Sequence, residues 1–592
     1  MFKLLYKIQA EKIFLSLLIL STLLPTFGAI DNNSIRWLFI SLISASYILK
    51  ILLNKEKVHY NSILNTVLFI VILYIGFSTL NADNVNEGVI SAYKILITIS
   101  VFFLSIFAFK KIENPVLFLA QLFSFFLLLE SIYLIVDYNI SRSFIKGVAQ
   151  NPNISSSSIL FKLIFFLYLK DNFKNLKFKF LIWIIEITAI ISIIILQSRL
   201  GLLSLIFIYF SIFMTQRSIR KKTIFSFLII LTSFMYFSNT TSSNILSYNF
   251  SEDESSIQRI EFYNTAIDLI KQKPLFGFGL GSWKYESLSY SSLKNERILV
   301  PYYTHNDFLQ IFVEMGILGF IIYLSFFIKI GFEIFKKFKL DSFYFYSGIA
   351  LVVFFGNTML NFPVHRSQEI IPFIIYSALI LSISDIKLLW NKKKPLFIYS
   401  LLILLIPSSA IAYQEHKSLI IQGQLLSDYE KGYYSIERNT LDKINFKLPN
   451  LSANTAPISS YLARYYFELG DKDKAQELLE YSVLANKNDL LTKELMLRNY
   501  IFLNRDEEAY KIAKELIFLY PNNETYGNFY FLYISKLKKY DELYVNPIIY
   551  FSKNLKIHLS FYSTLREEET FNKNNVSKLV RYSQSIFPNK KF

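Results

Sequence analysis

Thirteen apolar segments constrain the fold of this chain more than any other feature of its sequence. A helix that crosses a bilayer needs about 20 mostly apolar residues, and most of these segments approach that length. Hydrophobic residues make up 53% of the 592 residues, which is typical of a chain with many spans. The sequence therefore predicts an all-α polytopic membrane protein with about 13 transmembrane helices. The candidate spans are 13–30, 37–53, 63–80, 89–109, 116–136, 154–169, 180–196, 200–214, 224–237, 308–328, 343–360, 370–386 and 396–413.

Basic residues indicate how these spans are oriented, because Lys and Arg are retained in cytoplasmic loops. Clusters of Lys and Arg occur in alternate connections, whereas the connections between them, such as 31–34 and 81–88, contain few. The net charge of +17 follows from these clusters, so we expect no nucleic-acid partner. We predict a multi-pass protein of the bacterial inner membrane, surrounded by membrane lipids, with a cytoplasmic N-terminus and a periplasmic C-terminal region. Cysteine is absent, which excludes disulfides.

Two outward segments are too long to be simple connections, and long loops in compact proteins are usually functional. They divide the chain into four predicted regions. Residues 1–237 form the first nine spans, and 238–307 form a large outer loop. Residues 308–413 form the last four spans, and 414–592 form a periplasmic α-helical domain.

The C-terminal region contains an internal repeat. Residues 468–475 resemble residues 502–509 with a spacing of 509 − 475 = 34, and a fainter copy follows at 537–543. This period resembles the tetratricopeptide repeat. Such repeats stack and leave a groove that commonly holds a peptide or a partner helix. We therefore expect a protein partner, with a plain helical spacer as the alternative.

Three sequence blocks occur in order around the outer loop. They read KPLFGFGLG at 273–281, HNDFLQ at 305–310 and EMGILG at 314–319. Together they resemble the O-antigen ligase/polymerase family. Gly147 with Asn-Pro-Asn at 151–153, and QSRLG at 197–201, are similar to further elements of that family. The resemblance covers residues 1–390.

The resemblance implies a GT-C-like membrane glycosyltransferase. The implied reaction is an inverting transfer of a preassembled glycan from undecaprenyl diphosphate to an acceptor hydroxyl at the periplasmic face, without metal or another cofactor. Three acceptors fit this chemistry. They are a lipid A-core sugar, a growing polysaccharide, and Ser or Thr of a protein.

Arginine suits the departing diphosphate, because guanidinium stays charged and binds phosphate oxygens by two parallel hydrogen bonds. Arg199, Arg259 and Arg366 all fall on the predicted outer side, so we predict that they bind the diphosphate. For Arg199 the alternative is an interfacial charge that reaches into the headgroups.

The acceptor hydroxyl needs a base, and histidine has an unperturbed pKa close to neutral pH. His305 joins the outer loop to a span, and the resemblance implies that it is the catalytic base. Asn306 and Asp307 beside it are predicted to orient its ring or to bind sugar or acceptor. Asn151 and Asn153 are predicted to contact sugar or acceptor as well.

Two other classes of protein compete with this interpretation. A glycolipid or polysaccharide transporter would also have many spans and buried charges, but transporters place substrate groups near the bilayer midplane. A non-catalytic, membrane-anchored scaffold would leave the sequence blocks unexplained. Lys94, Glu130, Lys162 and Glu186 lie inside predicted spans. We expect them to pair with other charges, with a polar path for substrate as the alternative.

Overall fold

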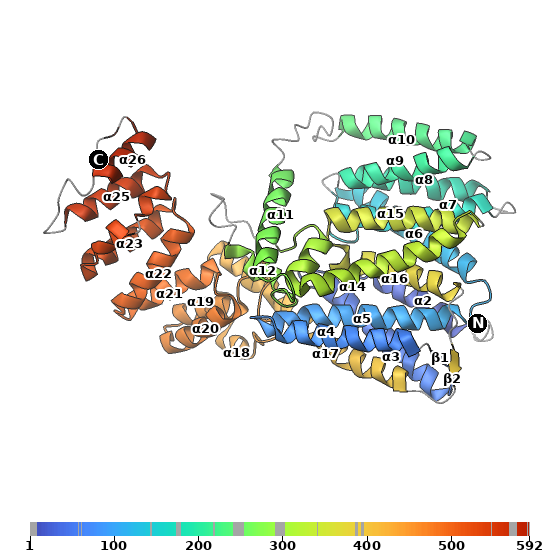
Figure 1. The fold of residues 1–592 in the computed structure, drawn as a ribbon, viewed down its shortest axis with the longest axis horizontal. Coiled ribbons are helices and arrows are strands. Elements are labelled where there is room, and N and C mark those ends of the chain that lie inside the picture. The colour runs from blue at the N-terminus through green and yellow to red at the C-terminus, as the bar shows by residue number, and fades with distance from the viewer. Residues whose placement is uncertain are drawn as a thin grey trace. The chain divides into compact units, whose positions relative to one another are not determined.

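The structure of the chain is a computed structural model. It describes residues 9–56, 58–60, 62–141, 145–172, 179–216, 220–240, 254–289, 302–339, 341–384, 389–391, 396–545, 547–567, 577–588 and 590. Helices dominate these residues (Figure 1). The chain divides into two compact units. Unit 1 comprises Met1–Gly281 and Tyr303–Ile420, and unit 2 comprises Ser282–Tyr302 and Ile421–Phe592.

Each of the thirteen candidate spans corresponds to one helix of unit 1, and the prediction of an all-α polytopic membrane protein is confirmed. Seven described helices are long and apolar enough to cross a membrane, and five more apolar helices have 10–17 residues. The helices are α2 (Ala10–Ser21), α3 (Asn33–Leu53), α4 (Ser62–Leu80), α5 (Val85–Phe109), α6 (Pro115–Ser141), α7 (Pro152–Asn172), α8 (Lys179–Ile195), α9 (Arg199–Thr215), α10 (Arg220–Thr240), α14 (Asp307–Lys337), α15 (Ser342–Leu360), α16 (Ser367–Ser382) and α17 (Leu396–Lys431).

Several other elements of unit 1 lie outside this set. A short antiparallel pair is formed by β1 (Val58–Tyr60), which follows α3, and β2 (Leu389–Asn391), which precedes α17. The 3-10 turn η2 (Pro363–His365) connects α15 to α16, and α11 (Glu254–Gln272) belongs to the predicted outer loop. Figure 1 shows α11 running across the direction of the long helices, which is the orientation expected of a loop helix rather than a span.

The first candidate span is wrong in its extent. The sequence predicts 13–30, but α2 ends at Ser21. Pro25 follows closely, and proline both removes a helical hydrogen bond and keeps the preceding residue out of the helical conformation. Phe27 and Gly28 then adopt positive φ angles of 47° and 89°. Apolar character alone therefore overestimates this helix.

Ionisable side chains inside the predicted spans are paired. Lys162 Nζ lies 2.7 Å from Glu130 Oε1, and Lys94 Nζ lies 2.9 Å from Glu415 Oε1. Glu186 accepts from Lys170 at 2.5 Å. A buried charge is tolerated when an opposite charge and hydrogen bonds compensate for lost hydration. The expected charge pairing is therefore present at all four sites that the sequence singled out.

The last helix of unit 1 is longer than the span predicted at 396–413. α17 continues without interruption to Lys431, a length of 36 residues. Its continuation is polar, and Glu415 accepts hydrogen bonds from Lys94 and Tyr93 while His416 Nδ1 lies 3.3 Å from Ser34 Oγ. These side-chain contacts hold the helix in place beyond its apolar half.

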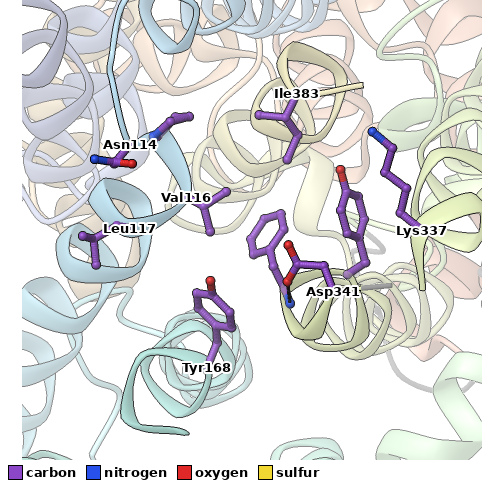
Figure 2. A pocket seen from close by; sticks show the side chains of 10 residues that line it. Asn114, Val116, Leu117, Tyr168, Lys337, Asp341 and Ile383 are labelled. Atoms are coloured by element: carbon purple, nitrogen blue, oxygen red, sulfur yellow. Dashed lines mark hydrogen bonds between the residues drawn. The ribbon is translucent and has the colours of Figure 1, made fainter. Parts of the chain in front are cut away.

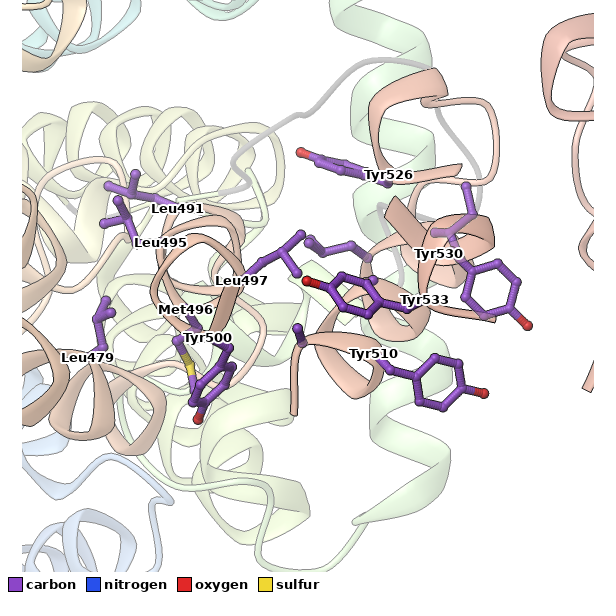
Figure 3. Close-up of a cluster of buried hydrophobic side chains, with 14 of the residues drawn as sticks. Leu479, Leu491, Leu495, Met496, Leu497, Tyr500, Tyr510, Tyr526, Tyr530 and Tyr533 are labelled. Atoms are coloured by element: carbon purple, nitrogen blue, oxygen red, sulfur yellow. The ribbon is translucent and has the colours of Figure 1, made fainter. Parts of the chain in front are cut away.

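Unit 2 consists of helices stacked in chain order around one continuous apolar core, part of which is drawn in Figure 3. Its repeat is visible in the backbone. The turns that close successive helix pairs carry a left-handed residue at Gly470, Asn504 and Lys538, and 504 − 470 = 538 − 504 = 34. The resemblance to the tetratricopeptide repeat itself stays a prediction. The elements are α12 (Trp283–Glu286), α18 (Arg438–Leu441), α19 (Ile458–Glu468), α20 (Lys472–Ala485), α21 (Leu490–Phe502), α22 (Asp506–Leu519), α23 (Glu524–Leu537), α24 (Asp541–Val545), η3 (Ile548–Tyr550), α25 (Leu555–Arg566) and α26 (Ser577–Ile586).

Candidate functional site

The backbone around His305 is fixed by the start of α14. Asn306 is the N-cap residue, and its side-chain oxygen accepts from the Leu309 N–H at 3.1 Å. Thr304 Oγ1 accepts from the Asn306 N–H at 3.1 Å and donates to the Asn306 carbonyl at 2.7 Å. Between them, His305 has a φ of 56°. Left-handed conformations in residues other than glycine are uncommon and cluster at functional sites.

The imidazole of His305 lies among aromatic rings. Phe362 meets it edge-on at 5.0 Å, and Phe262 stacks at 6.3 Å. The Tyr263 hydroxyl donates to the His305 carbonyl at 3.1 Å, which ties α11 to this position. Nδ1 of His305 is buried and has no hydrogen-bond partner among the described residues. Nδ1 thus has hydrogen-bonding capacity that the described part of the chain does not use.

Two causes lower the pKa of His305 to about 4. Burial disfavours the charged imidazolium, and the positive charge of Arg259 adds to this effect. His305 is therefore neutral at physiological pH, which is the form that accepts a proton.

This pKa predicts the pH dependence of any reaction in which His305 is the base. Protonation removes the base, so kcat/KM should be independent of pH between about 5.5 and 8 and should fall only as the pH drops through about 4. A bound diphosphate would favour the imidazolium and should raise the pKa seen in kcat. The measurement is a pair of pH–rate profiles. An inflection of kcat/KM near 6.5 would contradict the buried, Arg-facing environment.

Arg366 and Arg259 belong to the surroundings of His305. Arg366 Nη1 binds both carboxylate oxygens of Asp31, at 2.9 and 3.2 Å. Its guanidinium lies 5.5 Å from the centroid of the Phe362 ring, the same ring that contacts His305. Arg259 extends from α11 close enough to influence the pKa of His305. Part of the charge of Arg366 is thus neutralised by Asp31, whereas Arg259 acts directly on His305.

Arg199 and the two asparagines form a neighbouring group. Asn151 caps α7 by accepting from the N–H groups of Asn153 and Ile154, at 3.0 and 3.3 Å. Ser198, the N-cap residue of α9, donates to Asn153 Oδ1 at 2.8 Å and precedes Arg199. These bonds fix the base of the Arg199 side chain. Asn153 also lines a narrow crevice between α7, α9 and α15.

An apolar contact connects the two groups. Ala149 and Ile154 pack with Phe362, and Tyr303 lies against the same cluster. The structure therefore brings the segments around Asn151, His305 and Arg366 together, although they are far apart in sequence. Asn306 and Asp307 have roles in the fold instead of contacts with the His305 ring. Asp307 is 1% exposed, and its Oδ2 accepts from the Val364 N–H at 3.2 Å.

Sequence reasoning missed some residues that build the site. Arg36 is 2% exposed and donates to the carbonyls of Leu24 and Val148 at 2.9 and 2.8 Å and to Gln368 at 3.0 Å. It joins α3 to α16 and to the loop before α7. The signal was a single arginine at the start of an apolar segment on the side otherwise poor in basic residues. Phe362 and Tyr303 carried no signal, because aromatic residues are frequent throughout this chain.

The glycine-rich block 273–281 binds a break in α14. Gly316 interrupts that helix with φ 62° and ψ −166°, and a Cβ there would lie 2.2 Å from the Leu275 carbonyl oxygen. The freed backbone groups bond to the block, since Gly279 N–H donates to the Glu314 carbonyl at 2.8 Å and Ile317 N–H donates to the Pro274 carbonyl at 2.9 Å. The glycines thus permit close contact between two backbones, as the interpretation of this run as a tight turn requires.

A large pocket of unit 1 is not part of this site. It has a volume of about 690 Å³ and lies where Lys337 ends α14, 30 residues after Asp307 (Figure 2). Asn114, Tyr168 and Asp341 also line it. The candidate site around His305 is at the opposite end of the same helix.

Fold and site together define a class, that of multi-pass helical membrane proteins with a histidine and several arginines gathered where the helices end. Residues 184–324 match the family model described as O-antigen ligase, so the resemblance to that family is confirmed over this segment. The match includes Arg199, Arg259, His305, Asn306 and Asp307. No curated protein and no solved structure matches the chain.

Proposed function

We propose that the chain transfers a preassembled glycan from undecaprenyl diphosphate to an acceptor hydroxyl at the periplasmic face of the inner membrane. The observation that supports this most is the neutral, half-buried imidazole of His305 close to Arg259, inside the segment that matches the O-antigen ligase model. A base and a cation next to each other are what such a transfer needs, because one step removes a proton and releases an anion.

In the proposed reaction the acceptor oxygen attacks C1 of the first sugar from the face opposite the diphosphate. The acceptor proton moves to His305. The bond between C1 and the phosphate oxygen breaks, and its electron pair leaves with undecaprenyl diphosphate. Inversion at C1 follows from this direct displacement. Arg199 and Arg259 stabilise the charge that develops on the leaving group.

Arg366 has a different part in this proposal. Its Nη1 is bonded to Asp31, and its guanidinium faces Tyr303 and Phe362. We infer that it chiefly holds the aromatic wall of the site and that it contributes to diphosphate binding. Asn151, Asn153 and the amide nitrogen of Asn306 are the proposed contacts for sugar or acceptor hydroxyls.

The acceptor can belong to three classes, namely a lipid A-core sugar, a growing polysaccharide, or Ser and Thr of a protein. The stacked helices of unit 2 favour a protein as partner or acceptor, since stacked helical repeats commonly bind peptides. The alternative functions, a glycolipid transporter and a scaffold, need no base and no cation at one end of the helices.

Purified chain in detergent micelles tests the proposal. Given a glycan on undecaprenyl diphosphate and a mixture of the three acceptors, an enzyme should release free undecaprenyl diphosphate without any membrane gradient. The measurement is the appearance of that lipid by mass spectrometry. A transporter or scaffold would release none, and that result would refute the transfer.

The proposed orientation has its own test, because a cytoplasmic unit 2 would not meet a periplasmic acceptor. Gly432 follows α17 and is predicted to lie on the outer side of the membrane. An alkaline phosphatase fused after this residue should therefore be active, and a fluorescent protein fused there should be dark. A fusion after Lys337 should give the reverse pattern and serves as the control. An inactive phosphatase and a bright fluorescent protein after Gly432 would show that the C-terminal unit faces the cytoplasm.

A further inference from the structure

Unit 2 contains a pocket of about 330 Å³ that is rich in cations. Arg464 of α19, Lys472 at the start of α20 and Arg498 of α21 line it. Among the residues that the structure describes, these three side chains form no ion pair with a carboxylate. Several other cations of this unit do, for example Lys556 with Glu524 at 2.8 Å. Three unpaired cations in one pocket attract an anion.

Aromatic rings hold two of these cations in place. The Arg464 guanidinium lies 4.2 Å from the centroid of the Tyr434 ring and donates to the Tyr433 carbonyl at 3.1 Å. Lys472 Nζ lies 3.3 Å from the centroid of the Phe502 ring. Such contacts orient a cation without neutralising it. The donors of the pocket are therefore largely preorganised for a ligand.

The same contacts favour a peptide over a sugar. Sugars bind aromatic side chains through the ring face, and in this pocket Arg464 and Lys472 lie over the faces of Tyr434 and Phe502. The rings nevertheless remain 41% and 59% exposed, so their edges offer apolar surface beside the cations. Exposed tyrosine and arginine side chains together are typical of the residues that dominate protein interfaces.

Two carboxylates lie in the wall as well. Glu494 accepts from the Tyr526 hydroxyl, whereas Glu468 has no hydrogen bond or ion pair among the described residues. The pocket thus has three positive and two negative side chains. It retains a net positive charge, and Glu468 repels any anion that enters.

We propose that this pocket binds a carboxylate of an acidic peptide segment in a partner protein, with Arg464 and Arg498 as the donors and Leu491 and Leu495 as the apolar wall (labelled in Figure 3). The inference concerns recruitment by unit 2 and does not depend on the transfer reaction. It names the chemistry of the partner that the helical repeat was expected to have.

The test measures fluorescence anisotropy of a labelled hexa-glutamate peptide on the full chain in detergent. Binding should weaken as salt rises, because salt screens the attraction between the carboxylates of the peptide and the cations of the pocket. Arg498→Gln should weaken it about 10- to 100-fold, the expected effect of losing a hydrogen bond to a charged group. Glu468→Gln should strengthen binding, because it removes a repelling charge from the wall.

Arg505→Gln is the matched control. It removes the same charge from the same unit, but Arg505 is paired with Glu508 at 2.5 Å and does not line the pocket. Binding by this variant should equal that of the unchanged protein. The peptide should also bind His305→Ala unchanged, which separates recruitment from transfer.

Further probes identify the carboxylate and the class of ligand. Hexa-glutamate with an amidated C-terminus should bind if side-chain carboxylates suffice, and loss of binding would assign the pocket to a terminal carboxylate. Tri-galacturonate is the sugar probe. Preference for it over the peptide, or equal weakening by Arg498→Gln and Arg505→Gln, would overturn the proposal.

Discussion

Replacement of His305 with alanine is expected to reduce turnover about 10²- to 10⁴-fold, the usual contribution of a positioned base. In the proposed reaction the neutral imidazole of His305 takes the acceptor proton. The measurement is the rate of undecaprenyl diphosphate release at saturating donor and acceptor. KM for the donor should change little, because His305 is not a predicted phosphate ligand.

The left-handed backbone at His305 supplies a sharp control. Asparagine tolerates a φ of 56° better than alanine does, so His305→Asn should preserve the fold while removing the base. If His305→Asn and His305→Ala are equally slow and equally stable to heat, the loss is chemical. Full activity in His305→Asn would show that only the backbone conformation matters and that His305 is not the base.

Replacement of Arg199 or Arg259 with lysine is expected to leave only part of the activity, and replacement with alanine should remove more. Lysine retains the charge but not the planar pair of donors that matches a phosphate. Loss of one hydrogen bond to a charged group corresponds to about 10- to 100-fold. Because these bonds strengthen as the diphosphate leaves, the effect should appear in kcat as well as in KM.

Arg220→Lys is the control for this pair of substitutions. Arg220 begins α10 and donates to the Phe213 carbonyl at 3.0 Å, in a connection predicted to be cytoplasmic. It should retain full activity. Unimpaired lysine and alanine variants at both Arg199 and Arg259 would refute diphosphate binding by these residues.

The helices could be predicted from the sequence because each depends on a local, strongly apolar pattern. Their ends were less predictable. α2 stops before Pro25, where backbone chemistry overrides hydropathy, and α17 runs past residue 413 because Glu415 and His416 find partners on α5 and α3. Contacts between distant segments decide where such helices end. A hydropathy pattern along the sequence carries no information about these contacts.

His305 and Arg259 stood out in the sequence by residue type and by sequence block, and the structure places Arg259 close enough to His305 to lower its pKa. The aromatic wall of Phe362 and Tyr303 was not, since it depends on packing between segments about 60 residues apart. Asn306 and Asp307 show the converse limitation. Their position beside His305 suggested contact with its ring, but the side-chain oxygen of Asn306 caps α14 and Oδ2 of Asp307 accepts from the Val364 N–H. Residues adjacent in sequence at a helix start face different neighbours.

The break at Gly316 also sets how α14 matches a bilayer. All 31 residues as one straight helix would measure about 46 Å, well over the roughly 30 Å hydrocarbon thickness. The 21 residues from 317 to 337 measure about 31 Å, which matches that thickness. The nine residues from Asp307 to Met315 then lie outside this stretch of about 31 Å, at the end of the helix next to His305. Transfer should therefore respond to the acyl-chain length of the surrounding lipids, because a thicker membrane would draw this first segment, and with it His305, below the phosphate plane.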